Sequence, residues 1–150
     1  MTSSEGEKSP LSQWDERICD AAWNGDAAGV RELHLVGADV DCYNRNGNTP
    51  LHLAIEQEHF ETVLALLDCG ADIERRTELG DWTPLLHAVD IASDAAIQCN
   101  RRPDHRIIAL LLVRGADPNQ RASRGESALM LAKEYRNREA ERMLRVAGAV

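Results

Sequence analysis

Short blocks of apolar residues recur along the chain at helical spacing, and polar, glycine-containing stretches separate them. The segment HFETVLALLDCG predicts a helix that ends at Gly70, because its apolar residues lie three and four positions apart. The segment TPLHLAI predicts a shorter helix, with Thr49 as its N-cap and Pro50 in its first turn. The pattern therefore predicts an all-α fold in which turns alternate with pairs of short antiparallel helices.

These blocks repeat in a fixed register, which two independent sequence marks define. The tripeptide GAD begins at Gly37, Gly70 and Gly115, and a degenerate GAV begins at Gly148, so the intervals are 33, 45 and 33 residues. The segment NTPLHLA returns as WTPLLHA and as ESALMLA in matching positions. One pair of helices could not bury its apolar face alone, so neighbouring pairs must stack into a solenoid with a continuous core.

The two marks resemble the ankyrin-repeat family, whose unit of about 33 residues carries a TPLH core. The polar composition of residues 1–11 predicts a disordered lead. The resemblance implies a repeat domain over 12–150, with four units at about 12–36, 37–69, 70–114 and 115–150. It implies that His52, the histidine of TPLH, is structural and ties the turn to the helix. It also implies a non-catalytic module that binds other proteins through its finger loops and inner helices.

The third unit departs from the family pattern by about eleven extra residues, ASDAAIQCNRR, at 92–102. The alanines and Ile97 of this insertion keep helical spacing, so we expect the inner helix to continue for about two turns and to end near Asn100. Insertions in solenoids emerge on one face, often the binding one. A contact with a partner and an idle loop both remain open for this segment.

The acidic residues are concentrated in the first half of the chain. The formal net charge is −8, with −9 over residues 1–70 and +1 over residues 71–150. Such a field repels nucleic acid and anionic membranes and speeds the encounter with a basic protein. We therefore expect a basic protein partner, no nucleic acid and no membrane, with solubility alone as the other explanation for the charge.

The remaining composition gives no sign of catalysis, a cofactor or a metal. No nucleophile elbow, phosphate loop or zinc-protease motif is present, so we expect no enzyme. Cysteines 19, 42, 69 and 99 lie more than twenty residues apart, which predicts free thiols and no zinc site. No long apolar run indicates a membrane span or a leader. We expect a cytoplasmic monomer with no cofactor.

Aromatic residues indicate where a partner would bind. Alignment of the units places Trp23 and Tyr135 at the ends of inner helices and Tyr43 and Trp82 in finger loops, whereas Phe60 takes a core position. We expect the first four to form an exposed stripe, because Trp and Tyr anchor many interfaces; packing of Tyr43 and Trp82 on neighbouring loops is the alternative. The expected partner-binding residues are Trp23, Tyr43, Arg45, Asn46, Asn48, Glu56, Gln57, Glu78, Asp81, Trp82, Asp90, Ile91, Arg124, Glu134 and Tyr135.

Two functions fit these expectations. The first is an inhibitor or immunity protein that occludes a basic partner, such as a nuclease toxin, through its concave face. The second is an adaptor or scaffold that bridges two proteins. With no catalytic domain in the sequence, we expect binding to be the whole task of the chain.

Overall fold

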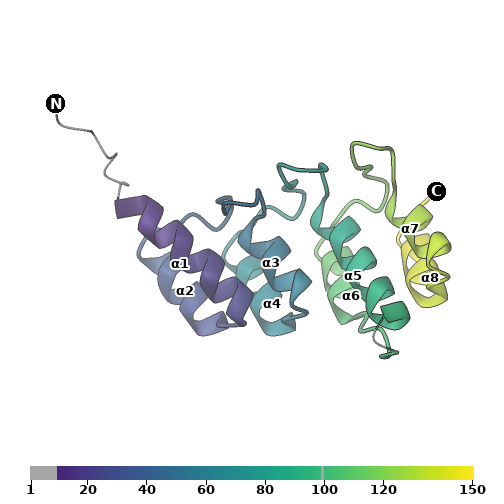
Figure 1. Ribbon diagram of the computed structural model, residues 1–150, viewed down its shortest axis with the longest axis horizontal. Helices are drawn as coiled ribbons and strands as arrows, with labels where there is room; N and C mark the ends of the chain where they lie inside the picture. Colours follow the sequence, from purple (N-terminus) through teal and green to yellow (C-terminus); the bar gives the residue numbers. More distant parts are fainter. Residues whose placement is uncertain (1–9, 99) are drawn as a thin grey trace.

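The computed structural model describes residues 10–98 and 100–150, and in this part eight α-helices follow one another as four pairs (Figure 1). The helices are α1 (Pro10–Asn24), α2 (Ala27–Leu35), α3 (Pro50–Glu56), α4 (Phe60–Asp68), α5 (Pro84–Gln98), α6 (Arg106–Val113), α7 (Ala128–Glu134) and α8 (Arg138–Val146). The predicted all-α solenoid is confirmed. Most of the expected lead lies outside the described residues, and α1 begins at Pro10, inside the range assigned to that lead.

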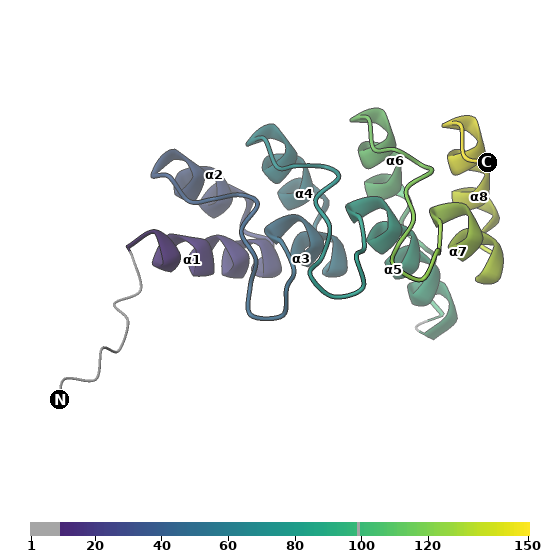
Figure 2. The ribbon, with the colours of Figure 1, turned by 90° about the horizontal axis from the view of Figure 1, so that it is seen from above.

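The helices form two layers, which Figure 2 separates. The inner layer consists of α1, α3, α5 and α7, the outer layer of α2, α4, α6 and α8, and each helix packs against its neighbours in the same layer and against the other helix of its pair. Three loops connect the pairs: the first finger (36–49), the second finger (69–83) and the third finger (114–127). Among the described residues no helix is both long enough and apolar enough to cross a membrane.

One continuous core runs between the layers from the first pair to the last. Its largest fully buried apolar side chains are Ile18, Val30, Leu51, Ile55, Val63, Leu66, Leu85, Leu86, Ile108, Leu111 and Leu144. Every pair contributes to this set, so each depends on its neighbour to exclude water. The core is therefore built by stacking, as expected for a solenoid.

The repeated Gly-Ala of the GAD mark ends each outer helix. At the end of α4, Gly70 adopts a left-handed φ of 89° and donates its N–H to the Leu67 carbonyl at 3.0 Å. Ala71 then donates to the Leu66 carbonyl at 3.0 Å, which completes a Schellman motif. Only glycine adopts this φ without strain, and Ala71 is buried, so both residues are required at this turn.

A second set of hydrogen bonds links each unit to the next, and we call it the side-chain ladder. In each rung a backbone N–H just after a Gly-Ala pair donates to a side-chain oxygen that lies about one repeat earlier in the chain. The rungs are Asp39 to Asp15 at 3.1 Å, Asp72 to Asp41 at 2.9 Å, Asp117 to Glu74 at 2.6 Å and Val150 to Asn119 at 3.0 Å. The ladder fixes the register between units.

His52 of the TPLH segment is fully buried at the start of α3. Its Nδ1 lies 2.8 Å from the Thr49 hydroxyl, and Thr49 is also the N-cap of the helix. On the other side of the ring, Nε2 donates to the Trp82 carbonyl in the second finger at 3.0 Å. The structural role expected for His52 is thus confirmed, and the bond to Trp82 extends it to the following unit.

The insertion lengthens α5 to 15 residues, against seven in α3 and in α7. The chain turns back near Asn100, which has a left-handed φ of 47°, so the predicted two extra turns and their end are confirmed. Arg101 then pairs with Glu58, and the buried Ser93 hydroxyl accepts the Asn137 amide at 3.1 Å. These contacts join the insertion to both neighbouring units; Cys99 lies outside the described residues.

Candidate functional site

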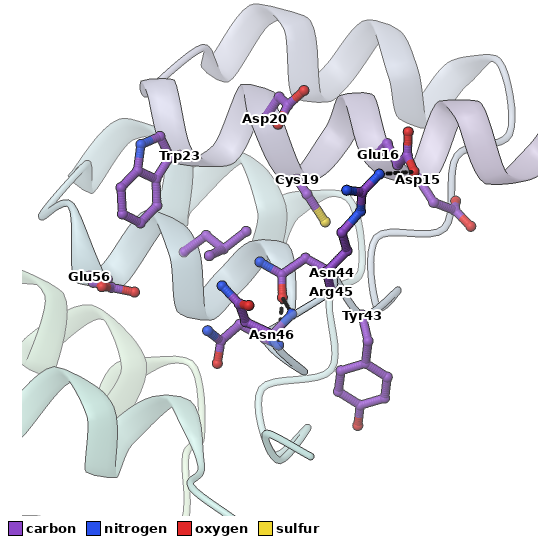
Figure 3. Close-up of a pocket in the computed structure, with 12 residues that line it drawn as sticks. Asp15, Glu16, Cys19, Asp20, Trp23, Tyr43, Asn44, Arg45, Asn46 and Glu56 are labelled. Atoms are coloured by element: carbon purple, nitrogen blue, oxygen red, sulfur yellow. Dashed lines mark hydrogen bonds and ion pairs between the residues drawn. The ribbon is translucent and has the colours of Figure 1, made fainter. Parts of the chain in front are cut away.

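A groove of about 750 Å³ lies between α1, the first finger and α3 (Figure 3). Two helices and one loop from successive units thus build one concave site. Twelve residues line it: Asp15, Glu16, Cys19, Asp20, Trp23, Tyr43, Asn44, Arg45, Asn46, Asn48, Leu53 and Glu56.

The α1 wall of the groove follows from helical spacing. Asp15, Cys19 and Trp23 stand four residues apart and therefore share one face of the helix. Trp23 is 43% exposed and is the large aromatic side chain most open to solvent in the described part of the chain. Its carbonyl accepts a hydrogen bond from His59 Nε2 at 3.1 Å, which holds the end of α1 against the second unit. The indole is therefore presented from a fixed backbone.

The first finger forms the opposite wall, and its own hydrogen bonds order its tip. The Asn44 carboxamide oxygen accepts the N–H groups of Asn46 and Asn48, each at 3.0 Å, and the Asn44 N–H donates to the Asn48 carbonyl at 2.9 Å. Gly47 supplies the left-handed φ of 74° that the turn needs. A loop ordered in this way loses little conformational entropy when a partner binds.

Carboxylates dominate the charge of the groove. Asp15, Glu16, Asp20 and Glu56 line it, and Arg45 is the one cation among the described lining residues, which together carry a formal charge of −3. Arg45 lies 3.8 Å from Glu16, and because both side chains are mostly exposed this pair contributes little stability. The groove therefore offers negative charge beside an exposed indole, a combination that attracts cationic side chains.

The predicted stripe of four exposed aromatics is wrong for three of its members. The Tyr43 hydroxyl donates to the Arg76 carbonyl at 2.8 Å, and the Arg75 guanidinium covers its ring at 4.9 Å. Trp82 packs against the core, with its ring edge-on to His87 at 6.4 Å. Tyr135 is half-buried. An aromatic ring that packs on a neighbouring finger leaves less apolar area exposed to water, which is favourable. This packing is the alternative that the sequence left open for Tyr43 and Trp82.

Six of the predicted binding residues meet in the groove, namely Trp23, Tyr43, Arg45, Asn46, Asn48 and Glu56. The other nine do not line it: Gln57 at the end of α3, Glu78, Asp81 and Trp82 in the second finger, Asp90 and Ile91 on α5, Arg124 in the third finger, and Glu134 and Tyr135 at the end of α7. Asp81 pairs with Arg76 at 3.3 Å. The predicted set is thus divided between the groove and positions outside it.

Among these outlying residues, Asp90 on α5 lies close enough to Tyr135, at the end of α7, for each to shift the pKa of the other. Burial raises the pKa of the Asp90 carboxyl, and the Tyr135 hydroxyl opposes that shift. The charge of Asp90 in turn raises the pKa of the Tyr135 hydroxyl. Asp94 and Glu134 lie close enough to raise the pKa of both groups, so a second acidic cluster stands two units away from the groove.

Sequence reasoning missed six lining residues: Asp15, Glu16, Cys19, Asp20, Asn44 and Leu53. The signal for the α1 members was the spacing of polar residues by four along the first inner helix. The signal for Asn44 was the YNRNGN stretch, in which an asparagine precedes a glycine turn. Comparison between units hid the α1 members, because the first unit has no preceding finger to align.

The described residues contain no group of three or more His, Cys, Asp or Glu side chains arranged to hold a metal ion. Burial lowers the pKa of His52 to about 3, assisted by the charge of His87, and burial lowers the pKa of His87 to about 4. Both imidazoles are therefore neutral near pH 7. His52 uses both ring nitrogens for structural hydrogen bonds, which leaves neither free to transfer a proton.

Comparison with known proteins points to one family. Residues 18–98 match the family described as ankyrin repeats, in three copies. Over 126 residues the chain is 32% identical to the ankyrin repeat protein YahD of Escherichia coli (strain K12), covering 84% of this chain and 60% of that protein. Over 91 residues it is 36% identical to the B-cell lymphoma 3 protein homolog of Mus musculus, covering 61% of this chain and 18% of that protein.

The chain is also similar to an L-asparaginase of Dirofilaria immitis, with 28% identity over 144 residues. That alignment covers 81% of this chain but 24% of the enzyme. The chain thus spans less than two thirds of the length of each of these three relatives.

Proposed function

Since the chain belongs to the ankyrin-repeat family, whose repeats form protein–protein interaction modules, we propose that it binds a basic segment of another protein in the acidic groove. The observation that carries this proposal is the gathering of four carboxylates and an exposed indole around one ordered concave site. Ankyrin repeats are generally non-catalytic, which agrees with a binding role.

The groove can recognise a lysine or arginine side chain in two ways at once. The face of Trp23 attracts a cation, a contact worth about 0.5 to 2 kcal/mol depending on burial. Asp20 and Glu56, which line the same groove, supply carboxylates for charge-assisted hydrogen bonds. Figure 3 shows Trp23 and Glu56 at one end of the groove, with Asp15 and Glu16 toward the other, so a basic segment of several residues has acidic partners along its length.

A single acidic groove suits an inhibitor or immunity protein that covers the basic surface of one partner. In this role the chain acts as a cytoplasmic monomer and forms a one-to-one complex. The adaptor role rests on a different observation, the second acidic cluster of Asp90, Asp94 and Glu134 around Tyr135. Two separate acidic sites would let the chain hold two basic partners at once.

Affinity purification with groove variants tests the proposal. The tagged protein is used to capture partners, which mass spectrometry identifies, beside the variants Trp23→Ala and Asp20→Asn/Glu56→Gln. We expect a basic protein that the wild type retains and both variants release, with a fall in affinity of at least tenfold. The matched control is Glu139→Gln/Glu141→Gln on α8, which removes the same number of carboxylates away from the groove.

The stoichiometry of the captured complex separates the two roles. A one-to-one complex that Asp90→Asn/Glu134→Gln leaves intact supports the inhibitor, whereas simultaneous capture of two proteins, one lost in each double variant, supports the adaptor. If the groove variants bind the partner as tightly as the α8 control does, the groove is not the binding site.

A further inference from the structure

Two buried thiols face each other where the first finger meets α1. The Sγ atoms of Cys19 and Cys42 are 3.7 Å apart, and the two residues are only 5% and 8% exposed. Cys19 belongs to α1 and lines the groove, whereas Cys42 belongs to the first finger, 23 positions along the chain. The Cys42 thiol also lies 3.6 Å from the Asp15 carbonyl, so its side chain points at the helix.

The two sulfurs are in contact but not bonded, and a small movement would join them. A disulfide has a sulfur–sulfur distance of about 2.05 Å, so each sulfur would have to move by about 0.8 Å. Rotation about the two Cα–Cβ bonds moves the sulfurs, and a finger can adjust more readily than a helix. No other pair of cysteines meets in the described part of the chain: Cys69 is half-buried at the end of α4, and Cys99 lies outside the described residues.

We propose that Cys19 and Cys42 form a reversible disulfide under oxidising conditions and that this bond fastens the first finger to α1. With hydrogen peroxide as oxidant, the Cys19 sulfur attacks one oxygen, the O–O bond breaks, and one water leaves as a sulfenic acid forms. The Cys42 sulfur then displaces the hydroxyl from Cys19, and the second water leaves. Two thiols lose two hydrogens in total, and a dithiol reductant returns them.

Cys19 is the sulfur that reacts first, because it lines the groove through which a small oxidant enters. The hydrogen bond with Cys19, together with burial, raises the pKa of the Cys42 thiol, so that thiol is neutral near pH 7. A neutral thiol is a weak nucleophile, which makes the pair slower to oxidise than an exposed reactive cysteine. The disulfide therefore forms only when the protein is exposed to an oxidant for a long time.

The disulfide joins the two walls of the groove, α1 with Asp20 and Trp23, and the finger with Arg45 and Asn46. It would hold the finger in the position that the structure shows and remove freedom from the unfolded chain. This inference stands on the geometry of the sulfurs and does not depend on what the groove binds.

Peptide mapping of the oxidised protein tests the pairing directly. The folded protein is treated with hydrogen peroxide, alkylated and digested with trypsin, which places the two cysteines in separate peptides, 18–31 and 32–45. Neither peptide contains methionine, so peroxide adds no sulfoxide to either. We expect these two peptides to be recovered as one cross-linked species that dithiothreitol separates, and the midpoint of thermal unfolding to rise by roughly 5 to 10 °C.

Two variants serve as controls for this experiment. The double variant Cys69→Ala/Cys99→Ala keeps the pair and must show the same cross-link and the same shift, whereas Cys42→Ala must show neither. If Cys42→Ala does not fold, the double variant carries the test alone. Recovery of peptides 18–31 and 32–45 as two separately alkylated thiols, a cross-link to Cys69 or Cys99 in the wild type, or a bond that lowers the unfolding midpoint would overturn the proposal.

Discussion

The second and third units begin their inner helices alike, with Thr-Pro-Leu, but they hold their histidines in different surroundings. His52 occupies the fourth position of the second unit's segment and bonds through both nitrogens, to Thr49 and to Trp82. His87 stands one position later in the third unit, and its buried Nε2 has no hydrogen-bond partner among the residues that the structure describes. One shift in register converts a tie between units into an unsatisfied polar group.

The third unit compensates for the missing tie with an arginine. Arg76 of the second finger donates to the Arg121 carbonyl and to the Gln120 carboxamide of the third finger, each at 2.7 Å. Ser123 adds a hydrogen bond to the Gly80 carbonyl at 3.1 Å. The junction between the second and third units is thus held by the buried, neutral ring of His52. The junction between the third and fourth units is held by the partly exposed cation of Arg76. The same stacking geometry can be held by groups that respond differently to pH and to substitution.

Replacement of His52 should have the largest effect. His52→Leu removes both hydrogen bonds of a fully buried ring, so we expect a loss of about 2 to 3 kcal/mol in the free energy of unfolding, measured by urea denaturation. His87→Leu is the matched control and should gain about 0.5 to 1 kcal/mol, because it removes a buried nitrogen that has no partner. Equal losses in the two variants would erase the distinction between the units.

The pH dependence of stability should be of similar size by pH 4. The folded pKa of His87 is lowered to about 4, against about 6.5 in the unfolded chain. Above pH 6.5 the ring is neutral in both states, so its titration costs the fold no stability there. As the pH falls from 6.5 toward 4, the unfolded state gains the proton first and stability declines, approaching about 1.4 kcal/mol per pH unit. His87→Leu should remove this share of the decline while that of His52 remains. Parallel curves for wild type and variant would contradict it.

Loss of the compensating arginine should cost less. Arg76→Ala should lower the free energy of unfolding by about 1 to 2 kcal/mol, because a charged donor leaves two acceptors in the third finger. The control Arg138→Ala changes the same residue type at the start of α8 and should move the unfolding midpoint little. If both variants behave alike in urea titrations, the junction between the third and fourth units does not depend on Arg76.

The smallest effect should be a gain at the turn between inner and outer helices. Gly25 takes a left-handed φ of 74° there in the first unit, whereas Arg136 takes 55° in the fourth. Arg136→Gly relieves strain on the backbone and should raise stability by about 0.5 kcal/mol, visible as a higher midpoint in urea. The reverse change, Gly25→Ala, should destabilise, since its Cβ would lie 2.9 Å from the His59 ring.

Sequence reasoning reached the local structure well because short-range signals determine it. Gly70 marks the end of α4, Thr49 and Pro50 mark the start of α3, and Asn100 marks the end of the insertion helix, each through its own backbone preference. The partner of His52 was half predicted: Thr49 is three residues away, but Trp82 is thirty residues away. A contact between units depends on the path of a neighbouring finger, which the repeat pattern does not specify.

The candidate site was harder to predict for the same reason. Tyr43 and Trp82 were predicted to be exposed because finger loops project from the stack, yet each finger packs on the next. The Arg75 guanidinium covers the Tyr43 ring, and the Tyr43 hydroxyl donates to the Arg76 carbonyl. Cys19 and Cys42 carry no recognisable spacing and meet only after α1 and the first finger have packed. Residues in the groove could be proposed one by one from the family resemblance, whereas their grouping required the stack.

The side-chain ladder has a consequence for how such a chain can grow. Asp41 accepts the N–H of the following unit through its side chain, and Asp39, two residues earlier, donates its own N–H to the preceding unit. A single gene segment therefore encodes both halves of the joint, so an internal duplication of the second unit would bring a matching donor and acceptor with it. New copies could be inserted in register without any compensating mutation, and evolution could lengthen the array before refining the surface of each added unit.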